Sequence, residues 1–150
     1  MLKLSRKSEY GLIALKYMLN RSSETPCSAR EIAGRYKIPE ELMAKILQKL
    51  AKDGVIVSTQ GVRGGYVLAL TPAEISVAQI VECLDGPIGI VDCFVNSGED
   101  CECVQFSEGV CNIHDPFMQI QLKFKSFLSG ISLADLNEST GHQKLYHIAV

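Results

Sequence analysis

Four cysteines and one histidine lie close together in the second half of the chain. They are Cys93, Cys101, Cys103, Cys111 and His114, and they fall within 22 residues that show neither helical nor strand periodicity. Thiolate and imidazole groups are the protein ligands of iron-sulfur clusters and of zinc ions. The segment therefore predicts a metal or cluster site that is held by a loop.

The spacing of these cysteines distinguishes the two kinds of site. Seven, one and seven residues separate successive cysteines, and the segment has no Cys-x2-Cys pair of the kind common in zinc sites. This spacing suits a loop that wraps around a larger cofactor, so it favours an iron-sulfur cluster. Acidic neighbours such as Asp92 and Glu102 disfavour free thiolates. A zinc site and a thiol switch stay open as alternatives.

The composition indicates the size of the fold and the cellular compartment in which such a site would lie. The chain has 150 residues, of which 47% are hydrophobic, enough for one small domain with an extension. It contains neither an apolar run of 18 residues nor a signal-peptide pattern. We therefore expect a cytoplasmic protein without membrane contact, in which clustered cysteines are metal ligands or redox groups rather than disulfides. Cys27 and Cys83 lie in helix-like patterns and are expected to be ordinary buried side chains.

The charge is distributed unevenly along the chain. Residues 1–66 carry 12 Lys or Arg and 6 Asp or Glu, whereas residues 67–150 carry 3 and 11. A basic first half suits a polyanionic partner such as double-stranded DNA. The sequence contains no nucleophile with a matching base, no paired catalytic carboxylates and no phosphate-binding loop. We therefore expect neither an enzyme nor a small-molecule substrate.

Three predicted helices fill the basic half. Residues 5–20 have apolar side chains at helical spacing. Ser28 and Glu31 form a capping box, in which both side chains are expected to bind free backbone amides at the start of a second helix. Pro39 opens the third helix, which Gly54 ends. Two short helices joined by a tight turn are typical of a helix-turn-helix.

A glycine-rich hairpin follows the third helix. Runs at 55–58 and 66–70 favour β-strands, and Arg63 lies in the glycine-rich loop between them. An arginine on such a loop can pair with a phosphate or enter a narrow minor groove. The position of the hairpin directly after the helix-turn-helix predicts a DNA-binding winged helix.

Two further helices flank the cysteine segment. One is expected over residues 73–84, with Ser76 as a cap, and the other begins at Asp115. The second helix carries apolar residues from Phe117 to Ile131 at spacings of three and four. This stripe needs a partner, and a homodimer is expected because DNA half-sites come in inverted pairs. Packing onto its own winged helix is the alternative.

The expected fold is mainly α. It comprises a winged helix-turn-helix over residues 1–71 with a two-stranded β wing. A helix, a cysteine-rich sensor loop and a long C-terminal dimerisation helix follow over residues 72–137, and residues 138–150 form a tail.

Over nearly its whole length the chain resembles the Rrf-type winged-helix regulators, the family that includes IscR and NsrR. The matching stretches are LSRKSEYGLIAL near the start, SAREIAGRYKIPEELMAKILQKLAKDGVIVSTQGVRGGYVLAL through the wing, EISVAQIVECLDGPI before the cysteines, and SLADL near the end. The resemblance implies a dimeric transcription factor that senses iron-sulfur, redox or nitric oxide status through a cluster, with 2Fe-2S preferred to 4Fe-4S. It also implies control of iron-sulfur cluster assembly genes.

The resemblance also implies a ligand set. Cys93 matches the family's first cysteine, Cys111 matches the last, and His114 matches the histidine that the IscR type uses. The middle ligand is open because Cys101 and Cys103 both fall in its region, and four thiolates could bind the cluster without the histidine.

Glu9 is a further alternative ligand, because it falls where NsrR-like proteins place a carboxylate that is donated across the dimer. Rival functions are a zinc-based or thiol-based redox repressor and an iron-sulfur carrier that does not bind DNA. For DNA contact, the resemblance points to Ser28, Arg30, Glu40, Glu41, Lys45, Lys49, Gln60, Arg63 and Gly64.

Overall fold

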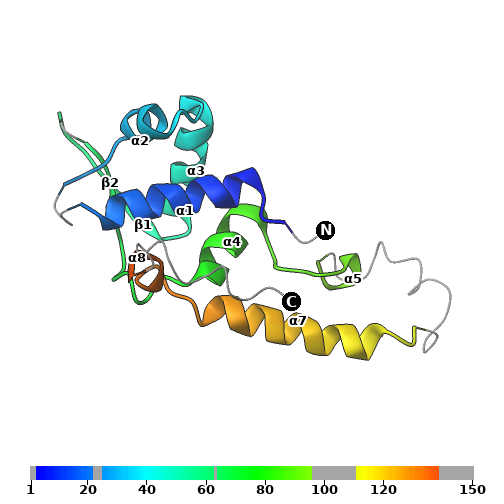
Figure 1. Cartoon of the computed structure of the whole chain (residues 1–150). Coiled ribbons are helices and arrows are strands. Elements are labelled where there is room, and N and C mark those ends of the chain that lie inside the picture. Colours follow the sequence, from blue (N-terminus) through cyan, green and yellow to red (C-terminus); the bar gives the residue numbers. More distant parts are fainter. Residues whose placement is uncertain (1–2, 22–24, 63, 96–110, 139–150) are drawn as a thin grey trace.

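The computed structural model describes residues 3–21, 25–62, 64–95 and 111–138, with only the backbone described for Asp92, Cys93 and Glu138. Helices dominate, which confirms the expected fold class (Figure 1). No helix in these ranges is long and apolar enough to cross a membrane. The elements are α1 (Arg6–Leu19), α2 (Ala29–Tyr36), α3 (Glu40–Lys52), β1 (Ile56–Thr59), β2 (Gly65–Leu68), α4 (Val77–Asp85), α5 (Asp92–Val95), α7 (His114–Ser129) and α8 (Asp135–Glu138).

Serine side chains start three of these helices. Ser5, Ser28 and Ser76 each precede a helix, and each hydroxyl accepts hydrogen bonds from backbone N–H groups of the first turn. These N–H groups have no partner within the helix, so the caps fix where each helix begins. The cap at Ser76 makes α4 begin at Val77, after a turn over residues 72–74, and not at residue 73 as expected.

Glu31 does not complete the expected capping box. Ser28 accepts from the Glu31 N–H at 3.1 Å as predicted, but the Glu31 carboxylate binds the side chains of α1 and the residues after it. The Tyr17 hydroxyl donates to it at 2.7 Å, and Arg21 forms an ion pair with it at 2.6 Å. Tertiary partners thus replace the local bond, and they fix the end of α1 against α2.

The wing is a two-stranded antiparallel sheet. Thr59 pairs with Gly65 next to the loop, and the second strand ends at Leu68, two residues earlier than expected. Cys27, expected in a helix, instead exchanges two backbone hydrogen bonds of 2.9 Å with Tyr66 of β2. The prediction was wrong because Cys27 pairs with the wing, a tertiary contact that local pattern does not reveal.

One hydrophobic core joins the winged helix to the end of the chain. Leu15, Leu47, Leu50 and Ile80 are fully buried in it, and so is Leu133, which follows α7. Backbone hydrogen bonds of 2.8 Å on either side of Ser76 and Ser132 hold this returning segment in place. The residues between α7 and α8 therefore anchor one end of α7 to the winged helix, and Figure 1 shows α7 extending from there to α5.

Candidate functional site

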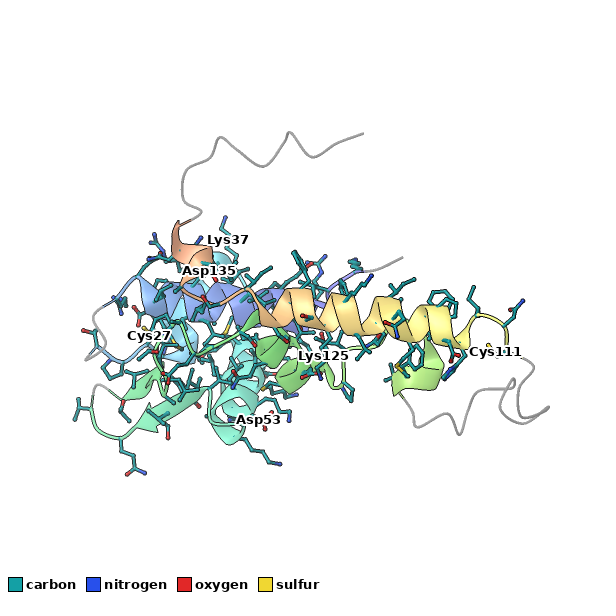
Figure 2. All side chains as sticks on the ribbon, turned by 90° about the horizontal axis from the view of Figure 1, so that it is seen from below. Cys27, Lys37, Asp53, Cys111, Lys125 and Asp135 are labelled. Carbon is teal, nitrogen blue, oxygen red and sulfur yellow. The ribbon has the colours of Figure 1, made fainter. Side chains whose placement is uncertain are left out.

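The two ends of the cysteine segment meet beside α5 and the start of α7. Cys93 lies in α5, Cys111 is exposed just before α7, and His114 is the first residue of α7. The Phe94 and His114 rings make an edge contact with their centroids 5.5 Å apart. Figure 2 shows Cys111 at the end of α7 that lies beside α5. The fold thus brings together residues that are 18 or more positions apart in the sequence.

The donors at these two ends suit an iron-sulfur cluster or a zinc ion. They comprise a cysteine at each end and an imidazole. Within the described ranges no three His, Cys, Asp or Glu residues lie close enough to hold a metal ion. Cys101 and Cys103 are outside those ranges, as is the side chain of Cys93. Nδ1 of His114 lies 3.0 Å from the Asp115 carboxylate, which leaves Nε2 for a metal.

The other two cysteines are buried and held in the thiol form. Cys27 is 1% exposed and Cys83 is 7% exposed, as expected for ordinary buried side chains. Burial raises the pKa of Cys27, and burial together with the nearby Asp53 raises the pKa of Cys83 to about 12. Metals bind the thiolate, so the raised pKa values disfavour both residues as ligands. Figure 2 also shows Cys27 far from Cys111.

Glu9 lies half-buried in the first turn of α1. This turn is tied to the end of α4, because the hydroxyls of Ser5 and Ser8 each donate to the Asp85 carboxylate at 2.6 Å. Asp85 is eight residues before Cys93, so the contact joins the helix of Glu9 to the start of the connection that leads to the cysteine segment. Donation of the Glu9 carboxylate across a dimer stays a prediction.

The second helix of the helix-turn-helix presents the polar face that was expected. Met43, Ile46, Leu47 and Leu50 of α3 are buried, whereas the predicted contact residues are on its exposed face. Lys49 forms an ion pair of 3.1 Å with Asp53, which partly compensates its charge. The exposed residues on this face are Glu40, Glu41, Lys45, Gln48, Lys49 and Lys52.

The remaining predicted DNA contacts lie at the start of α2 and in the wing. Ser28 is half-buried and serves as the α2 cap, whereas Arg30 and Gln60 are exposed. Arg63 is outside the described residues. A Cβ atom on Gly64 would lie 2.7 Å from the Thr59 carbonyl oxygen. The tight hairpin therefore requires glycine at position 64, whatever its part in DNA binding.

Two residues near the cysteine segment were missed by the sequence reasoning. They are Asp85 and Gln121, neither of which is among the site residues predicted from the sequence. Gln121 lies four positions after Phe117 and three before Phe124, within the apolar stripe of α7. A polar residue in such a stripe was a signal that it has buried partners.

A winged helix-turn-helix followed by a cysteine segment and a long helix defines a DNA-binding transcriptional regulator. The model of the Rrf2 family, described as an iron-dependent transcriptional regulator, matches residues 4–139. The chain belongs to this family, which confirms the resemblance inferred from the sequence. Members of the family are transcriptional regulators, so the expectation that this chain is not an enzyme is confirmed as well.

Relatives and solved structures agree with this assignment. The regulator NsrR of Geobacillus kaustophilus is 29% identical over 137 residues, covering 91% of this chain and 90% of the relative. The regulator IscR of Aliivibrio salmonicida is 29% identical over 135 residues, covering 90% and 77%. The structure of CymR, the global cysteine regulator of B. subtilis, is 30% identical with a TM-score of 0.72, covering 93% of this chain and 99% of CymR. T. potens IscR, at 24% identity, shares the fold with a TM-score of 0.73, covering 96% and 92%.

Proposed function

We propose that this protein is a cytoplasmic, dimeric DNA-binding regulator that senses iron-sulfur, redox or nitric oxide status through a cluster held between Cys93 and His114. The observation that carries the proposal is the approach of α5 to the start of α7, where the Phe94 and His114 rings meet. The description of the family as iron-dependent also supports it. When bound, a cluster supplies iron that can change its redox state.

The proposed ligand set has two fixed members. Cys93 and Cys111 would bind the cluster, and Cys101, Cys103 or His114 would complete the set, with Glu9 as the alternative. We favour a 2Fe-2S cluster and expect the regulated genes to include those for iron-sulfur cluster assembly. A zinc-based repressor uses the same donors and is the second candidate.

Helix α4 provides a route from the cysteine segment to α3. At its C-terminal end Asp85 binds α1, and the Cys83 thiol donates to the Lys49 carbonyl oxygen of α3 at 3.7 Å. On the other side, Glu82 forms an ion pair of 2.6 Å with Lys125 of α7. A full switch between two DNA-binding states needs a difference in stabilisation of about 5.5 kcal/mol. Movement of α4 against α3 would transmit this difference in stabilisation to the DNA-binding face.

Anaerobic purification tests the cluster directly. We expect a coloured protein with visible charge-transfer absorption and about two iron and two sulfide per chain, because thiolate-bound iron absorbs visible light and a 2Fe-2S cluster contains two of each atom. Absorption spectra and analysis for iron, sulfide and zinc provide the measurement. A colourless protein with about one zinc per chain would contradict the cluster and support the zinc repressor.

The proposed dimer rests on the exposed apolar side chains of α7. Phe127 is 64% exposed and Leu122 is 55% exposed, although both are large and apolar. Both side chains line one open surface depression on α7, and exposed apolar residues of this size mark an interaction surface. A second copy of the chain is the partner we propose, because paired wings and recognition helices match inverted DNA half-sites.

Phe127→Glu should convert the dimer to a monomer. A buried charge without a partner costs more than the lost contact, so we expect the dissociation constant to rise by roughly 30-fold or more. Size-exclusion chromatography with light scattering should show a mass that falls from twice 16.4 kDa to 16.4 kDa. Leu70→Glu is the matched control, because Leu70 is 39% exposed and lies outside α7. An unchanged mass for Phe127→Glu would remove α7 from the dimer interface.

A further inference from the structure

Gln121 is a buried polar side chain in an otherwise exposed part of α7. It is 7% exposed, whereas its neighbours Ile120 and Leu122 are 50% and 55% exposed. A buried amide needs hydrogen-bond partners, because leaving either end without one costs free energy. The orientation of the Gln121 side chain is therefore fixed by its hydrogen-bond partners.

Both ends of this amide bind the backbone of one short segment. The Ile90 N–H donates to Oε1 of Gln121 at 2.9 Å, and Nε2 of Gln121 donates to the Ile88 carbonyl oxygen. The two partners lie on either side of Gly89, so one side chain fixes both the position and the direction of the segment. Only a side chain with an adjacent donor and acceptor can make both bonds.

The segment held in this way also supports α5. A Cβ atom on Gly89 would lie 2.0 Å from Cγ2 of Val95, so the absence of a side chain at position 89 lets α5 fold back onto the segment. Cys93 lies in α5, three residues after Ile90. Any shift of residues 88–90 away from α7 would therefore carry Cys93 with it.

The same helix carries the opposite end of the cysteine segment. Gln121 is seven residues after His114, which places the two on the same face of α7, two turns apart. Next to them the Phe94 ring of α5 contacts the His114 ring. The C-terminal end of the cysteine segment is thus covalently continuous with α7. The residues that lead to its N-terminal end are held on α7 by Gln121.

We propose that Gln121 is a positioning residue, which holds residues 88–90 on α7 and thereby keeps α5, the helix that contains Cys93, beside His114 at the start of α7. The inference rests on the proposed function, because it assigns Gln121 a part in holding the cluster. It differs from a contact that only stabilises the fold, since it predicts that cluster retention depends on the amide.

Gln121→Met tests the inference, because methionine has a similar length and no amide. In the protein without a cluster, we expect hydrogen exchange at the Ile90 amide to be about tenfold faster. In anaerobically reconstituted protein, we expect a chelator such as EDTA to remove iron about tenfold faster, with a shifted visible spectrum. Gln119→Met is the matched control, because Gln119 lies on an exposed part of the same helix and should change neither value.

Gln121→Glu provides a second variant if methionine prevents folding. The carboxylate keeps the shape of glutamine and can still accept from the Ile90 N–H, but it cannot donate to Ile88. We expect faster iron loss with more of the Ile90 protection retained than in the methionine variant. Thermal unfolding followed by circular dichroism confirms that each variant is folded.

Three results would count against the inference. Unchanged exchange at Ile90 in Gln121→Met would show that the amide does not hold the segment. Faster exchange with an unchanged spectrum and rate of iron loss would make Gln121 a contact of the fold alone. A wild-type chain that takes up no cluster would contradict both the proposed function and the positioning role. Hydrogen exchange at Ile90 is measured without a cluster, so it still shows in that case whether Gln121 holds residues 88–90.

Discussion

Cys111→Ser should abolish cluster binding. Cys111 is exposed at the start of α7 and, with Cys93, belongs to every ligand set that the sequence allows. Serine has nearly the same shape but does not form the thiolate that binds iron. Changes to residues that merely support a ligand typically cost 10-fold to 100-fold in metal affinity, so loss of the ligand itself should lower bound iron by more than about tenfold. Iron and sulfide analysis after anaerobic purification measures this loss.

Cys83→Ser is the matched control for this experiment. The Cys83 thiol is buried against the Lys49 carbonyl oxygen, a contact that a serine hydroxyl can also make. We expect this variant to keep its iron and its colour. Full iron content in Cys111→Ser would exclude Cys111 from the ligand set and would require a different site.

The same assay identifies the middle ligand. If Cys101 and Cys103 are redundant, neither single serine variant should abolish binding, whereas the double variant should. Complete loss in one single variant would assign that cysteine as the ligand. Loss of bound iron in His114→Ala would favour the ligand set that includes the histidine.

Replacing Lys45 and Arg63 with alanine should weaken DNA binding strongly. Lys45 is exposed on α3 and has no ion-pair partner among the described residues, and Arg63 lies in the wing loop. Each contact of a cation with a phosphate releases about 0.9 counterion, so each single variant should lower the slope of log affinity against log salt by about 1. We expect affinity to fall roughly tenfold for each variant.

A random-sequence duplex of about 30 base pairs is a sufficient probe, because phosphate contacts do not depend on sequence. Fluorescence anisotropy at several salt concentrations gives both the affinity and the slope. Lys49→Ala is the control within α3, because Asp53 already compensates the Lys49 charge at 3.1 Å. Lys49→Ala should therefore lower the affinity for DNA less than Lys45→Ala does. An unchanged slope of log affinity against log salt in Arg63→Ala would show that Arg63 of the wing does not contact the DNA phosphates.

The sequence by itself determined the elements whose signals are local. Ser28 marked a helix start and Ser76 was identified as a cap, because a cap binds backbone groups only two or three residues away. The apolar spacing of α3 predicted which face is buried, and the glycine-rich loop predicted the wing. The cysteine pattern and the matching stretches predicted the family. The predicted ligands and DNA contacts stay predictions.

Only the tertiary structure decided which distant residues meet. Glu31 binds Tyr17 and Arg21 instead of its own helix start, because the fold brings these two side chains within hydrogen-bond and ion-pair distance of its carboxylate. In the same way Asp85 binds the first turn of α1, and Gln121 binds a segment more than 30 residues before it. Such contacts depend on how helices pack, and local propensity and spacing contain no information about packing partners. The sequence therefore supplied the candidate ligands, while the packing of α7 decided how the two ends of their loop are held together.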